Sequence, residues 1–161
     1  MNITNEELYP LLRDFFKAIP DSGIKTIPNA NKISRVVDNI YSTVTKSEII
    51  NTIKTNPLFI VNNSLPKNAE IADCDDYALQ LKSSITSLYR ARSKIGNMLA
   101  PPAVGIVITQ NHALNIVLCQ TSENSYELFL IDPSSENPQF INDIENSLLA
   151  LKTLPISLIY I

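Results

Sequence analysis

The sequence is poor in the residues that build disulfide scaffolds and metal centres. It has two cysteines, Cys74 and Cys119, and one histidine, His112, among 161 residues. Two cysteines cannot form a disulfide framework, and without CxxC spacing they do not make a tetrahedral zinc site with a single histidine. Free cysteines in a reducing compartment are therefore the simplest expectation.

Long apolar runs and an excess of positive charge are also absent. No apolar run reaches the length of about 18 residues that marks a transmembrane helix, so we expect no membrane span. The net charge of -3 and the pI near 5.1 argue against non-specific binding to nucleic acid. The acidic, polar residues 1–7 are unlike a signal peptide, which favours a cytoplasmic location by default and leaves non-classical export open.

Apolar residues make up 45% and charged residues 18% of the chain, as in soluble globular domains. We expect one domain over residues 1–161, long enough to bury a core. The predicted class is α+β, with a helical half over 1–57 and, over 58–161, a cysteine-bearing helix and an antiparallel sheet.

Hydrophobic periodicity places the elements along the chain. Helices are predicted over 6–19, 31–44, 47–53, 73–96 and 143–151. Strands are predicted over 58–61, 104–109, 112–119, 126–132 and 154–161.

The stretch Asp73-Cys74-Asp75-Asp76-Tyr77 sets a cysteine where a helix begins. His112 and Asp132 follow in that order, and Cys, His, Asp is the set of a thiol nucleophile, its base and an orienting acid. Other readings stay open at this point. A cysteine on a helical stripe is more often a core residue, and Asp73 and Asp76 have the spacing of a capping box.

Strand periodicity offers a way for His112 and Asp132 to meet. If the strands around Ser122 form an antiparallel hairpin, residues whose numbers sum to 244 lie opposite each other, and His112 faces Asp132. Opposed Cβ atoms are roughly 4.5–5.5 Å apart, within reach of an imidazole–carboxylate hydrogen bond. The same register aligns one apolar face, Leu114, Ile116 and Leu118 against Leu130, Leu128 and Tyr126, with the stripe Cys74, Ala78, Leu81, Ile85 as its cover.

The helix start has opposing effects on the Cys74 thiol. The helix dipole and a nearby imidazolium favour the thiolate, whereas the charges of Asp75 and Asp76 disfavour it. A cation bound by the two aspartates would remove that conflict.

Three motifs in order, Asp-Cys-Asp-Asp-Tyr-Ala-Leu, Asn-His-Ala-Leu-Asn and Ile-Asp-Pro-Ser, resemble the C-terminal domain of fungal agglutinins and related phage-associated domains. The resemblance covers about residues 69–138. It implies a papain-like or transglutaminase-like fold, with Cys74 as nucleophile, His112 as base and Asp132 as the orienting acid. It also implies calcium as a candidate cofactor, held by Asp75 and Asp76. No lectin domain accompanies the motifs, so the resemblance does not imply sugar binding.

The sequence departs from the family pattern at several positions. Asp132 replaces a glutamate, Asn111 a glycine and Ser134 a glutamine. Residues 1–73 contain no glutamine to complete an oxyanion hole, so Asn62, Asn63 and Asn68 are the side-chain candidates for that donor.

The preferred interpretation is a cysteine peptidase-like acyl-transfer hydrolase acting on a peptide or amide bond of a peptide or protein substrate. Two alternatives stay open: an inactive papain-like binding or structural module, and a calcium-binding module with an incidental cysteine. Neither a nucleic acid nor a membrane partner is expected, and the sequence does not indicate the oligomeric state.

Overall fold

The computed structural model describes residues 1–19, 34–35, 38–57, 59, 73–93, 99–135, 137–151 and 156–161. Its elements are β1 (Asn2–Thr4), α1 (Asn5–Ala18), β2 (Ser34–Arg35), β3 (Ile40–Ser42), α2 (Lys46–Thr55), α4 (Cys74–Ser93), β4 (Val104–Thr109), β5 (Ala113–Ser122), β6 (Ser125–Ile131), α5 (Ile144–Leu151) and β7 (Ile156–Tyr160). The α+β class is confirmed.

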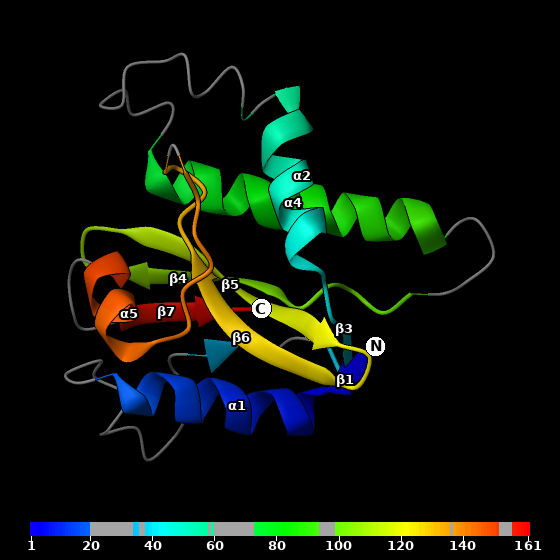
Figure 1. Cartoon of the computed structure of the whole chain (residues 1–161), viewed down its shortest axis with the longest axis horizontal. Coiled ribbons are helices and arrows are strands. Elements are labelled where there is room, and N and C mark those ends of the chain that lie inside the picture. Colours follow the sequence, from blue (N-terminus) through cyan, green and yellow to red (C-terminus); the bar gives the residue numbers. More distant parts are fainter. Residues whose placement is uncertain are drawn as a thin grey trace.

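A five-stranded sheet in the order β2-β7-β4-β5-β6 forms the middle layer, and β1 pairs with β3 in a second, two-stranded sheet. β2 is parallel to β7, whereas β7, β4, β5 and β6 pair antiparallel. Figure 1 shows α4 on one side of the large sheet and α1 on the other. The fold therefore has three layers, with helices covering both faces of a largely antiparallel sheet.

Each face of the sheet has its own hydrophobic cluster, because successive side chains of a strand point to opposite faces. Between the sheet and α1, the cluster contains Leu8, Leu12, Phe16, Leu114, Ile116, Leu118 and Leu130. Between the sheet and α4, it contains Tyr77, Leu81, Ile85, Val117, Cys119, Phe129 and Ile131. The second cluster holds α4 against the face of the sheet on which Cys74 lies.

The predicted cover of the hairpin's apolar face is wrong. Leu114 and Ile116 face α1, and the stripe that continues from Cys74 along α4 packs on the opposite face, against residues such as Val117. The long amphipathic helix α1, with Leu8, Leu12 and Phe16 buried, covers the Leu114 face instead. Both faces of β5 are apolar, so strand periodicity could not decide which helix covers which.

The register of the β5–β6 hairpin differs from the prediction by two residues. Ile116 pairs with Leu130 and Leu118 with Leu128, so paired numbers sum to 246. The turn lies at Glu123 and Asn124, beyond the predicted centre at Ser122. An even shift leaves every side chain on its predicted face, since alternation along a strand has a period of two.

The N-terminal half is only partly helical. α1 and α2 confirm two predicted helices, and each starts with a capping box, at Thr4 and Thr45. The helix predicted over 31–44 is wrong where the structure describes it, because β2 and β3 occupy part of that range. Phe59 is helical, so the strand predicted over 58–61 is wrong at this residue.

No helix in the described part of the chain has both the length and the apolar character needed to cross a membrane.

Candidate functional site

The helix that carries Cys74 begins where the sequence predicts. Asp73 caps it: the backbone N–H of Asp76 donates to Asp73 Oδ1 at 3.4 Å, and that of Tyr77 donates to Asp73 O at 3.2 Å. α4 then starts at Cys74. The cap places the Cys74 thiol in the first turn of α4, over the end of β5.

The Cys74 thiol contacts the chain immediately after His112. The backbone N–H of Ala113 donates to Cys74 Sγ at 3.2 Å. The thiol is half-buried and packs against a small cluster that includes Ala78, Ile106 and Ala113. Residues 39 positions apart are thereby joined at one point, and the Cys74 thiol lies beside the backbone of the residue that follows His112.

A second contact joins two of the predicted site residues, His112 and Asp132. His112 Nε2 lies 3.1 Å from Asp132 Oδ2. Because an ionised carboxylate only accepts hydrogen bonds, Nε2 is the donor in this contact. The imidazole is 4% exposed and the carboxylate 20% exposed. The predicted pairing is confirmed, although the residues lie at the ends of their strands rather than in the predicted register.

The second oxygen of Asp132 is also held. Ser134 donates to Asp132 Oδ1 from its backbone N–H at 3.0 Å and from its hydroxyl at 2.5 Å. Burial alone would raise the pKa of Asp132, but the hydrogen bonds from His112 and Ser134 outweigh it and hold that pKa below its ordinary value of 3.8. Asp132 is therefore a fixed, ionised acceptor at neutral pH.

The acidic residues at the start of α4 interact with one another. A hydrogen bond between the carboxyl groups of Asp73 and Asp75 lowers the pKa of Asp73 and raises the pKa of Asp75. Among the described residues no group of three or more His, Cys, Asp or Glu side chains is arranged to hold a metal ion. Calcium binding by Asp75 and Asp76 stays a prediction.

Asn62, Asn63 and Asn68, the predicted oxyanion-hole candidates, lie outside the described residues. Asn115 lies two residues after Ala113 in β5 and is fully buried. Its side-chain amide donates to Ala78 O at 2.8 Å and to Gly105 O at 3.0 Å. This amide ties α4 to β4 directly behind the site.

A groove of about 520 Å³ lies beside the His112–Asp132 pair, and Asp132 is part of its lining. Its lining comes from the chain between β6 and α5, and from α5 itself: Asp132, Ser135, Asn137, Gln139, Phe140, Ile141, Asp143, Asn146, Leu149 and Ala150. Backbone hydrogen bonds between Leu130 and Ile141, at 2.8 and 2.9 Å, hold the returning chain against the edge of β6. This groove was not predicted from the sequence, although the many amides between residues 137 and 146 are a signal that could have indicated it.

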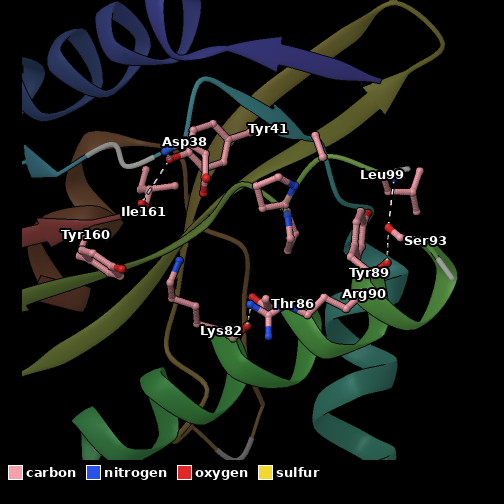
Figure 2. Close-up of a pocket in the computed structure, with 13 residues that line it drawn as sticks. Asp38, Tyr41, Lys82, Thr86, Tyr89, Arg90, Ser93, Leu99, Tyr160 and Ile161 are labelled. Carbon is pink, nitrogen blue, oxygen red and sulfur yellow. Dashed lines mark hydrogen bonds between the residues drawn. The ribbon is translucent and has the colours of Figure 1, made fainter. Parts of the chain in front are cut away.

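A second pocket, of about 400 Å³, lies along the other half of α4, between that helix, β3 and the end of β7 (Figure 2). Its cationic lining residues, Lys82 and Arg90, were also not predicted.

No protein-family model matches the chain, and no curated protein matches it. Solved structures share its fold, among them these two. The "PSL1a-E64 complex" is 16% identical with a TM-score of 0.62, and the match covers 99% of this chain and 50% of that one. A Polyporus squamosus lectin bound to the human-type influenza-binding epitope Neu5Acα2-6Galβ1-4GlcNAc is 14% identical with a TM-score of 0.57, covering 99% and 49%. The chain spans about half the length of these structures.

These comparisons correct the function predicted from the sequence. The relation to fungal agglutinins holds at the level of the fold, since a fungal lectin shares it. The interpretation as a cysteine peptidase-like acyl-transfer hydrolase is contradicted, because the solved structures that share the fold include a lectin bound to a glycan. His112 and Asp132 do form a contact, and Cys74 contacts Ala113, but these contacts do not make the chain a hydrolase.

Proposed function

We propose that this chain is a non-catalytic binding module of papain-like or transglutaminase-like architecture, and that its ligand is a glycan. The observation that carries the proposal is the groove of about 520 Å³ beside Asp132. A volume in this range is typical of small-molecule sites, which combine an apolar wall with a few convergent polar groups.

The groove has both kinds of lining. Asn137, Gln139 and Asn146 provide amides, each with paired donors and an acceptor, and the carboxylates of Asp132 and Asp143 provide acceptors. Vicinal sugar hydroxyls donate and accept side by side, so planar amide and carboxylate groups match them. Phe140 supplies the flat apolar wall against which the C–H face of a sugar ring can pack.

Several of these groups are already positioned. Asp143 accepts from the backbone N–H of Asn146 at 2.9 Å and from its side-chain amide at 3.0 Å. Phe140 packs edge-on against Phe129, with ring centroids 5.9 Å apart. A ligand therefore meets a lining that loses little conformational freedom on binding.

In this proposal His112 and Ser134 are positioning residues. Their hydrogen bonds fix both oxygens of Asp132, which is the one member of the predicted set that lines the groove. Catalytic roles for Cys74, His112 and Asp132 stay untested.

The lectin among the solved structures adds support of a different kind, because its ligand ends in Galβ1-4GlcNAc. Among the described residues, the lining of the groove includes two carboxylates and no cation, and Lys46 Nζ lies 5.3 Å from the centroid of the Phe140 ring. A sialic acid group would therefore meet like charge from Asp132 and Asp143 in the groove. We therefore expect the uncharged disaccharide Galβ1-4GlcNAc to bind at least as well as Neu5Acα2-6Galβ1-4GlcNAc.

The test is a calorimetric or NMR titration of the purified chain with both saccharides. Replacement of Asn146 by alanine should weaken disaccharide binding about tenfold, the equivalent of about 1.4 kcal/mol. Asn51→Ala is the matched control, since Asn51 is exposed on α2 and lies outside the groove. Absence of binding by the wild type, or equal weakening by both variants, would refute the proposal.

A further inference from the structure

The pocket along α4 is separate from the glycan groove and differs from it in charge. Its lining comprises Asp38, Tyr41, Lys82, Thr86, Tyr89, Arg90, Ser93, Leu99, Ala100, Pro101, Pro102, Tyr160 and Ile161. None of these residues lines the groove beside Asp132. In Figure 2, Lys82, Thr86 and Arg90 lie along the α4 side, with Tyr41, Tyr160 and Ile161 across from them.

Lys82 is the inner cation of this pocket. Its Nζ donates to Val104 O at 2.6 Å and lies 5.1 Å from the centroid of the Tyr160 ring. An ammonium has three N–H donors, so this bond leaves two available to a ligand. Burial lowers the pKa of Lys82, while Asp38 opposes that shift. A partly desolvated ammonium of this kind gains from an anion placed beside it.

Arg90 is the outer cation, eight positions further along α4, a rise of about 12 Å. Long helical side chains point back toward the helix N-terminus, so the guanidinium can approach the Lys82 end of the pocket. Arg90 is exposed, and no carboxylate among the described residues pairs with it. Arg92, two positions on, differs: it forms an ion pair with Glu48.

The opposite wall is flat and held in place. The Tyr41 hydroxyl accepts from the backbone N–H of Asp38 at 2.8 Å and lies 3.4 Å from Ile161 O, to which it donates. Tyr160 and the pair Pro101–Pro102 provide apolar surface. Among the described residues of the lining, Asp38 is the one acidic side chain, against two cations.

We propose that this pocket binds a small organic anion, a carboxylate or a phosphate attached to a flat ring. Lys82 and Arg90 hold the anionic group, with Arg90 able to form two parallel hydrogen bonds to it. The ring packs between Tyr160 and the prolines. This site is independent of the glycan groove, since it uses other residues, another face of the fold and another ligand chemistry.

The experiment is an NMR titration of the whole chain with phenyl phosphate and phenylacetate, with benzyl alcohol as the uncharged probe. Both anions should perturb the signals of α4 residues 82–93 and of Tyr160, whereas benzyl alcohol should bind at least tenfold more weakly. Arg90→Gln should weaken anion binding about tenfold. Arg13→Gln removes the same charge from α1, where Arg13 pairs with Asp14, and should leave the affinity unchanged.

Other outcomes count against the site. Equal weakening by Arg90→Gln and Arg13→Gln would mean that only overall charge attracts the anions. Equal binding of benzyl alcohol, or perturbations confined to the groove beside Asp132, would also refute it. If inorganic phosphate binds as tightly as phenyl phosphate, the cations would be sufficient and the proposed ring contact wrong. Lys82→Met keeps the apolar stem and, where its circular dichroism matches the wild type, should give the same loss as Arg90→Gln.

Discussion

The two faces of the central sheet differ in the kind of contacts that they make. The face under α1 is closed by apolar side chains such as Leu12, Leu114 and Ile116. The face under α4 mixes apolar packing with buried polar groups: Asn115 bonds across to α4 and β4, and Cys74 accepts from Ala113. Neither candidate binding site is lined by a residue of α1: one lies along α4 and one between β6 and α5.

This difference indicates that stability and recognition are separated in the fold. Apolar packing under α1 stabilises the sheet through burial alone, which has no directional requirement. Polar contacts under α4 fix positions, because hydrogen bonds require defined distances and angles. Substitutions on the two faces should therefore have different consequences, and the predictions below test that separation.

The largest expected effect concerns the two cysteines. Cys119 is fully buried, and burial raises its pKa to about 12, which leaves about 10⁻⁴ of it as thiolate near pH 8. Cys74 is half-buried at the start of α4. We expect iodoacetamide to label Cys74 at least about 100-fold faster than Cys119, measured by mass spectrometry of the native chain.

The matched variants are Cys74→Ala and Cys119→Ala. Native Cys74→Ala should stay unlabelled until denaturant is added, while Cys119→Ala should label at the wild-type rate. Similar labelling rates for both cysteines would contradict the burial difference. Rapid labelling by itself would report exposure and thiolate content, and would not restore the hydrolase interpretation.

The next effect compares one leucine on each side of the sheet. Leu12 of α1 and Leu81 of α4 are both fully packed, 2% and 0% exposed. Each substitution by alanine should lower the free energy of unfolding by about 2–5 kcal/mol, measured by urea denaturation. Only Leu81→Ala should change the native labelling rate of Cys74, because α4 positions that thiol. An equal change from Leu12→Ala would show that the two faces are coupled.

The sequence predicted the C-terminal part of the fold well for a physical reason. Strands β4, β5 and β6 and helix α4 carry clear periodic patterns and a capping aspartate, Asp73, all of which are local signals. The Cys–His–Asp order located residues that the fold does bring together, by way of Ala113. An even error of two residues in the hairpin register did not change any face.

The errors lie where the outcome depends on distant partners. Residues 40–42 have apolar spacing that suits a helix, but they form β3 because β1 pairs with them. Such tertiary pairing overrides a weak local preference. The pocket along α4 could not be found from local patterns, since Tyr160 and Lys82 meet only after the chain has folded. The hydrolase interpretation failed because a shared constellation of residues does not determine function.

A smaller effect concerns the polar bond behind the site. Asn115→Ala removes the donor to both Ala78 O and Gly105 O, and we expect a loss of about 1–3 kcal/mol in the free energy of unfolding. Asn51→Ala, on the exposed face of α2, should change it by less than about 0.5 kcal/mol. If Asn115→Ala were neutral, the α4 face would depend on apolar packing as the α1 face does.

The smallest effect is a dependence on pH at Asp132. The folded pKa of this carboxyl lies below 3.8, since hydrogen bonds from His112 and Ser134 outweigh the effect of burial. The stability that Asp132 contributes is therefore present above its ordinary pKa and is lost as pH falls through the folded value. Because the pair is partly exposed, the contribution should be about 1 kcal/mol or less.

Urea denaturation of the wild type and of Asp132→Asn, at about pH 6 and again well below pH 3.8, measures this contribution. The difference between the two proteins should shrink at the lower pH, where the wild-type carboxyl becomes protonated like the neutral amide. Leu12→Ala provides the contrast, because an apolar substitution under α1 should cost the same at both pH values. A constant Asp132→Asn difference would mean that shape, rather than the charge of the carboxylate, accounts for its role beside the groove.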